Sequence, residues 1–145
     1  MSRFGRRDLL RAWLLATFLS GLPSTLYALL AGRDPMEATR AAGTMISMPG
    51  SLAAAALVHG AVSLFWALVL WLVLPRRHTV AWALAASVAI ALLDLRAIAP
   101  AFFPEVAALD FWPQFADHLM WGACVGYGLI ARWPPRAIRR RAARS

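Results

Sequence analysis

The sequence has few charged side chains and almost no cysteine, and both scarcities exclude classes of protein. Only 15% of the 145 residues are charged, whereas 61% are hydrophobic. Disorder, coiled-coil and collagen structure are excluded because apolar residues dominate in long runs. Cys124 is the only cysteine, so no internal disulfide can form. A disulfide-stapled secreted fold is therefore excluded as well.

Lysine is also absent, and all fifteen basic residues are arginines. The net charge of +8 could indicate binding to nucleic acid. Most of the arginines, however, stand at the ends of apolar runs, where they act as determinants of membrane topology. We therefore predict no nucleic-acid partner.

Long apolar runs are what the sequence does contain, and its mean hydropathy is +0.60. About 20 helical residues reach roughly 30 Å, the thickness of the bilayer core. We predict an all-α fold, a polytopic four-transmembrane-helix bundle that forms a single integral membrane domain over 1–145. The predicted spans are 11–31, 52–74, 79–98 and 114–131, followed by a basic tail at 132–145.

The distribution of charge predicts the orientation of these spans. Twelve arginines lie toward one side and three toward the other, while most acidic residues lie on the second side. The positive-inside rule then places both termini in the cytoplasm of a bacterial inner-membrane, multi-pass protein. In the first outer loop, Asp34, Pro35 and Glu37 form a helix-start pattern. It predicts a short interfacial helix through about Gly43.

Small and helix-breaking residues predict how the spans pack and bend. Gly122 and Gly126 form a G-x-x-x-G pattern, which favours close contact between helices in lipid. Gly21 and Pro23 predict a kink in the first span. Ser51 follows a proline–glycine break and is the expected N-cap of the second span. A stripe of small residues on that span should also contact a neighbour: Ala56, Gly60, Ser63 and Ala67.

Several polar residues are predicted to lie at one depth in the outer half of the bundle. Each charge within the bilayer costs about 2.5–3.5 kcal/mol, so such residues are paired or functional. Two of the three histidines, His59 and His118, are expected to point into the bundle. The candidate intramembrane site comprises His59, Asp94, Asp117, His118, Ser63 and Tyr27.

Three interpretations of this cluster stay open. It is a hydrogen-bonded network that holds the helices in register, a proton-responsive site, or a metal site. The metal ligands would be His59, His118, Asp94 and Asp117, although no recognised metal-binding spacing is present. We predict no other cofactor and no catalytic residue, because no motif orients a nucleophile. The alternative function is a metal-binding protein, a small-solute or proton transporter, or a membrane enzyme that uses the same cluster.

The basic tail predicts contact with the membrane surface. Arginines next to a span gain about 1 kcal/mol each from anionic lipid headgroups. We leave open whether the small-residue faces of the helices contact a second copy of the chain, in a homo-oligomer, or a partner membrane subunit. The predicted lipid-binding residues are Arg136, Arg139, Arg140, Arg141 and Arg144.

One pattern resembles a known family. It consists of Val58-His59 with Ser63, a helix that closes at Pro75, the polar interruption at Asp94, a proline-rich outer loop, and Asp117-His118-Leu119 with Trp121. The last two-thirds of the chain is in this way similar to the YagU-type small inner-membrane proteins of bacteria. The resemblance implies a four-helix inner-membrane fold and a role in the envelope or in acid tolerance. It implies no mechanism, and this chain has Asp94 where a histidine is expected.

Overall fold

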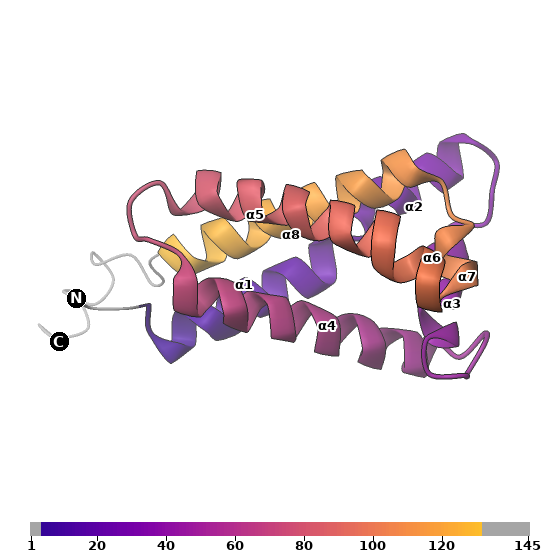
Figure 1. Cartoon of the computed structure of the whole chain (residues 1–145), viewed down its shortest axis with the longest axis horizontal. Helices are drawn as coiled ribbons and strands as arrows, with labels where there is room; N and C mark the ends of the chain where they lie inside the picture. Colours follow the sequence, from indigo (N-terminus) through magenta and orange to yellow (C-terminus); the bar gives the residue numbers. More distant parts are fainter. Residues whose placement is uncertain (1–3, 132–145) are drawn as a thin grey trace, which may run out of the picture.

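The computed structural model describes residues 4–131, and within that range every regular element is a helix. Long helices run along the longest axis of the molecule, and short ones gather at one end (Figure 1). The predicted all-α class is thus confirmed. The elements are α1 (Arg6–Leu19), α2 (Leu22–Leu30), α3 (Glu37–Thr44), α4 (Leu52–Val73), α5 (Thr79–Leu93), the π-helical turn η1 (Asp94–Ile98), α6 (Ala99–Phe102), α7 (Pro104–Ala107) and α8 (Phe111–Ile130).

Three segments within residues 4–131 are long and apolar enough to cross a membrane: Arg6–Leu30, Leu52–Val73 and Thr79–Phe102. The first begins before residue 11, where the span was predicted to start. Asp8 explains this, because its carboxylate accepts the Gly5 N–H at 2.8 Å and so caps α1. The helix α8 is of spanning length but is not one of these three segments.

Glycines on α8 bring it into contact with α5. A Cβ atom added at Gly122 would lie 2.4 Å from Ser87 Oγ, and one added at Gly126 would lie 2.7 Å from Val80 Cα. Both distances are too short for any side chain. The predicted G-x-x-x-G contact is thus confirmed, and its partner is α5.

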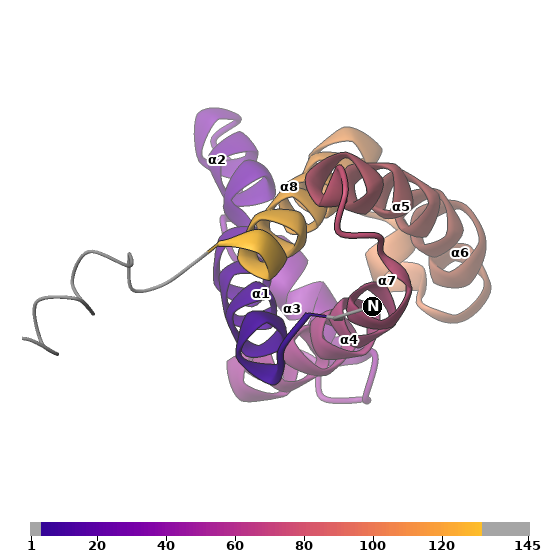
Figure 2. The ribbon, with the colours of Figure 1, turned by 90° about the vertical axis from the view of Figure 1, so that its left-hand side faces the viewer.

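A third glycine of α8 allows close contact between α8 and α1. A Cβ at Gly128 would lie 2.4 Å from Ala12 Cα, so the two backbones touch. The Gly128 carbonyl also accepts a hydrogen bond from Arg11 Nε at 2.9 Å. Viewed along the long axis, α1, α4, α5 and α8 surround a common centre, and α2 turns away from the line of α1 (Figure 2).

The helix α4 packs on α1 and α3, and it begins where the sequence predicted. The Ser51 hydroxyl accepts the Ala54 N–H at 3.2 Å and so caps its first turn. In the stripe of small residues, Ser63 and Ala67 are buried as predicted, but Ala56 is exposed. The stripe therefore contacts neighbours from Gly60 onward, where the Gly60 carbonyl accepts a hydrogen bond from Trp13 of α1.

The short helix α3 packs against α4 and α7, at the end of the bundle where the other short helices gather (Figure 1). It begins at Glu37 rather than at Pro35. Asp34 accounts for the difference, because its Oδ1 accepts the Met36 N–H at 2.9 Å and caps a turn before the helix. Asp34 also forms an ion pair with Arg40, which holds the turn against α3.

Candidate functional site

A proline interrupts the first membrane-crossing segment. The helix α1 ends at Leu19, and α2 begins two residues after Ser20. Pro23 has no N–H, so the Leu19 carbonyl loses the donor that a continuous helix would supply. The predicted kink at Gly21 and Pro23 is therefore confirmed as a break between two helices.

Side chains from two other helices bind the backbone on either side of this break. His59 of α4 donates from Nε2 to the Thr17 carbonyl at 3.0 Å, and the same nitrogen lies 3.3 Å from Ser20 Oγ. From the other side, Asp117 of α8 accepts the Ser24 backbone N–H on Oδ1 at 2.9 Å. Each end of the break thus has a side-chain partner.

The hydrogen-bonding roles of these partners match the helix ends that they bind. The carboxyl end of a helix carries a partial negative charge on its free carbonyl groups, and the amino end a partial positive charge on its free N–H groups. His59 binds the carboxyl end of α1 as a donor, and Asp117 binds the amino end of α2 as an acceptor.

A second irregular backbone lies on the other side of α8. At η1, the Ala99 N–H donates to the Asp94 carbonyl, which is the wide bonding pattern of a π-helix. This wide turn lets the helix pass Pro100, which has no N–H to donate. The third segment consequently continues to Phe102 instead of ending at residue 98 as predicted. Such turns are frequent at functional sites.

His118 of α8 binds this turn. Its Nε2 lies 3.3 Å from Asp94 Oδ2, and its Nδ1 lies 2.8 Å from the Gln114 carbonyl oxygen. Both side chains of the pair are about three-quarters buried, with 23% of His118 and 25% of Asp94 exposed. A carbonyl only accepts, so Nδ1 carries a hydrogen.

The geometry of His118 accommodates one further proton. A neutral imidazole has a single N–H, and here Nδ1 uses it on Gln114. A hydrogen between Nε2 and Asp94 must therefore be a second proton, shared by the imidazole and the carboxyl group. Without it, the lone pair of Nε2 faces a carboxylate oxygen.

Ser63 joins three helices in a hydroxyl network. It is buried, and its Oγ accepts hydrogen bonds from Trp121 Nε1 at 2.9 Å and from Thr17 Oγ1 at 3.1 Å. Nearby, Trp13 Nε1 donates to the Gly60 carbonyl at 2.9 Å. These bonds fix α4 to α1 and α8, which is a structural role.

The predicted cluster is divided in the structure rather than gathered at one point. His59 was expected to point into the bundle, but its side chain is exposed on the flank of α4. The cause is that α4 packs on α1 and α3, so this flank lies at the edge of the bundle. Tyr27 was expected to join the cluster, but it is 43% exposed and lines a pocket at the outer end.

The predicted metal ligands are divided in the same way. Among residues 4–131, no three histidine, cysteine, aspartate or glutamate side chains are placed so that they could hold a metal ion. The four side chains His59, His118, Asp94 and Asp117 are therefore not assembled into a ligand set here. The predicted lipid-binding arginines, Arg136, Arg139, Arg140, Arg141 and Arg144, lie outside the described residues.

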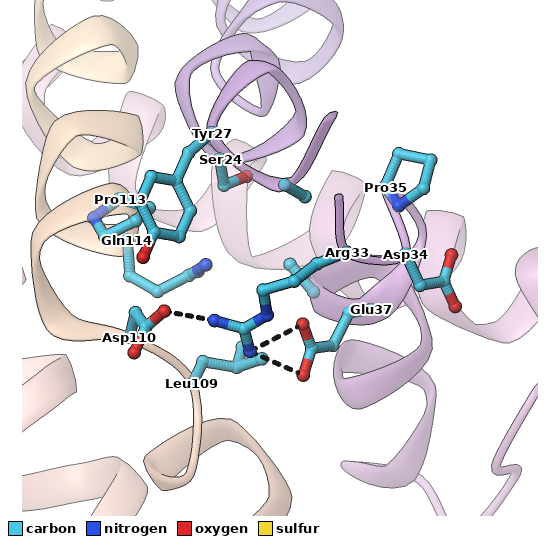
Figure 3. A pocket seen from close by; sticks show the side chains of 12 residues that line it. Ser24, Tyr27, Arg33, Asp34, Pro35, Glu37, Leu109, Asp110, Pro113 and Gln114 are labelled. Atoms are coloured by element: carbon cyan, nitrogen blue, oxygen red, sulfur yellow. Dashed lines mark hydrogen bonds and ion pairs between the residues drawn. The ribbon is translucent and has the colours of Figure 1, made fainter. Parts of the chain in front are cut away.

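A small pocket lies beside the site, at the end of the bundle near α3 (Figure 3). Its walls come from α2, the loop that follows α2, α3 and the start of α8. Ser24 and Gln114 line it, and these residues also bind Asp117 and His118. The pocket therefore reaches the outer edge of the site.

Arg33 lines this pocket between two acidic side chains. It bonds to Glu37 at 2.9 and 3.0 Å, and it forms a second ion pair with Asp110 (Figure 3). Hydrogen bonding to Glu37 is the main cause that raises the pKa of Arg33 above its ordinary value, and Asp110 adds to it. The guanidinium therefore stays charged.

The sequence reasoning missed two contributors to the site. Gln114 precedes His118 by one helical turn, and that spacing could have indicated a bond from the imidazole to the backbone. Arg33 was interpreted only through its effect on topology, although Glu37 stands four residues later on the same segment. Its link to Asp110 has no sequence signal, since 77 residues separate the two.

Comparison of the chain with protein-family models, curated proteins and solved structures found no match.

Proposed function

We propose that this chain is a four-span bacterial inner-membrane protein in which α8 binds protons from the outer side and transmits their binding to neighbouring helices. In this proposal it is an accessory protein of the envelope or of acid stress, and not an enzyme. The resemblance to the YagU-type proteins supports the same location. The proposal rests on the contacts of the His118 ring. Its Nδ1 bonds to the Gln114 carbonyl, so that a hydrogen between Nε2 and Asp94 is an additional proton shared by the two side chains.

The packing of α8 supports its assignment as the fourth span. Twenty residues reach about 30 Å, which matches the bilayer core. Two of the side chains that lower its hydropathy, Asp117 and His118, have partners on other helices. Its glycines bring it against α1 and α5. In this position a helix of moderate hydropathy needs little contact with lipid.

Labelling of single cysteines tests the proposed orientation. In a Cys124→Ala background, a cysteine at Met36 is expected to react with a membrane-impermeant thiol reagent added outside intact cells. A cysteine at Arg77 is expected to react only after the membrane is opened, because the positive-inside rule places that loop in the cytoplasm. The reverse pattern would contradict the proposed topology.

Two neighbouring residues of α8 bind the two irregular backbones of the bundle. Asp117 binds the break between α1 and α2, and His118 binds the π-helical turn η1. Breaks and π turns interrupt the regular backbone bonding of a helix. A proton gained or lost by His118 and Asp94 therefore changes the bond that fixes η1. The Arg96 guanidinium, which also belongs to η1, lies over the Phe111 ring, with its Cζ 4.1 Å from the ring centroid.

Protein stability at two pH values tests proton binding. The wild-type protein in mild detergent is expected to be more stable at pH 5 than at pH 8 by about 1 kcal/mol, because the shared proton leaves as the pH rises. Asp94→Asn is expected to remove this difference, since the asparagine amide can donate to a neutral Nε2. The measurement is the midpoint of unfolding in a denaturing detergent.

His78→Gln is the matched control, because this histidine lies in the loop after α4 and bonds to Arg77 rather than to α8. It should keep the wild-type difference between pH 5 and pH 8, whereas His118→Gln should lose it. A difference that persists in Asp94→Asn would show that the proton binds elsewhere.

The broken first segment favours a second candidate, a small-solute or proton transporter. Discontinuous helices form the binding sites of many transporters, with helix ends directed at the substrate. Proteoliposomes that contain a pH-sensitive dye distinguish the two functions. A transporter dissipates an imposed pH gradient, whereas a protein that only senses protons leaves it in place.

A further inference from the structure

We propose that Arg33 is an ion-pair latch that closes the outer pocket and controls how readily water and protons reach Asp117 and His118. The inference rests on the proposed proton-binding function, for which it names the control of access. It concerns only the outer end of the bundle.

The latch joins two segments that have no covalent link nearby. Arg33 follows α2, while Asp110 is the N-cap residue of α8, 77 positions along the chain. Glu37 also binds Arg33 but stands only one helical turn away, in α3. The Asp110 bond therefore crosses between the two outer loops, whereas the Glu37 bond stays within one of them.

The bond between the loops lies in the lining of the pocket. Figure 3 shows the Arg33 guanidinium between Asp110 and Glu37, among the side chains that line the pocket. The pocket walls also include Ser24 and Ala28, here called the pocket floor, and each of these is only 8% exposed. In the proposal, the closed ion pair limits the access of solvent to this floor.

The exposure of the latch makes its opening easy. The side chains of Arg33, Glu37 and Asp110 are 38%, 43% and 47% exposed. Ion pairs this accessible are weak, because water competes for both partners. Such a pair opens and closes readily, which suits a gate better than a permanent support.

The reactivity of a cysteine on the pocket floor tests the latch. Ala28→Cys in a Cys124→Ala background is treated with a small uncharged maleimide, so that local charge does not attract the reagent. Asp110→Asn, which breaks the bond between the loops, is expected to speed the reaction about tenfold. Glu37→Gln removes the same charge from the same arginine but leaves the loops joined. It is expected to react at the rate of the parent.

A charge reversal completes the test. Arg33→Gln should accelerate the reaction as Asp110→Asn does, and the combination Arg33→Glu with Asp110→Arg should restore the slow rate. Equal rates in Asp110→Asn and Glu37→Gln would overturn the latch, as would a parent that already reacts as fast as Arg33→Gln. A reversed pair that stays fast would also overturn it.

The two proposals fail in different ways. The latch affects the rate at which a reagent reaches Ala28→Cys, whereas proton binding is measured at equilibrium through Asp94→Asn. Unchanged reaction rates would overturn the latch and leave proton binding in place. A pH difference that persists in Asp94→Asn would overturn proton binding, while the accessibility results would still decide the latch.

Discussion

Alanine at position 128 is expected to force α1 and α8 apart and to destabilise the bundle by about 1–3 kcal/mol. The added Cβ of Gly128→Ala would lie 2.4 Å from Ala12 Cα and 2.8 Å from its backbone nitrogen. Backbone atoms cannot rotate away as the end of a side chain can, so a helix must shift. The shift would also lengthen the bond between Arg11 Nε and the Gly128 carbonyl. Unfolding in a denaturing detergent measures the loss.

Gly60→Ala is the matched control. A Cβ at Gly60 meets nothing within 4 Å, and the carbonyl bound by Trp13 is unchanged by the substitution. Alanine is favoured over glycine in a helix by roughly 0.5–1 kcal/mol, so this variant should be neutral or slightly stabilised. Similar losses in Gly60→Ala and Gly128→Ala would show that close contact between α1 and α8 is not the cause.

Asp117→Ala is expected to have the second-largest effect, a loss of about 1–3 kcal/mol. The substitution removes the acceptor for the Ser24 N–H and leaves that donor without its side-chain partner at the broken helix. Ser24 is buried, and a buried polar group without a partner costs about 1–3 kcal/mol. Besides the unfolding midpoint, hydrogen–deuterium exchange at Ser24 should become faster.

Asp117→Asn separates the hydrogen bond from the charge. Asparagine keeps an oxygen at the position that accepts from Ser24, so most of the stability should return and exchange at Ser24 should slow again. Only the attraction between a negative charge and the amino end of α2 is lost, roughly 0.3–1 kcal/mol. If Asp117→Asn were as unstable as Asp117→Ala, the charge and not the hydrogen bond would hold the break.

The features that could be predicted from the sequence depend on local chemistry. Pro23 lacks an N–H wherever it stands, so the break in the first segment follows from the residue itself. Ser51 after a proline–glycine pair predicted an N-cap, and Gly122 with Gly126 predicted a close contact. Each of these inferences uses residues within a few positions of one another.

The features that could not be predicted depend on how each helix is rotated about its axis. His59 and His118 were expected at one depth and directed into the bundle, but their depth does not determine which neighbour each of them meets. The π turn at Asp94 was also missed, since the sequence suggested only that the helix ends before Pro100. The bond from Arg33 to Asp110 requires the whole fold, because it forms only after both outer loops are in place.

The moderate hydropathy of α8 has a consequence for the biosynthesis of the protein. A translocon releases a segment sideways into lipid according to its hydrophobicity, and the polar and glycine positions of α8 weaken that preference. The ribosome completes α8 after α1 and α5, the helices that cover its glycine faces. In the proposed four-span topology, the order of the elements along the chain therefore supplies α8 with protein partners when it inserts. Moved to the start of the chain, the same helix would meet lipid alone.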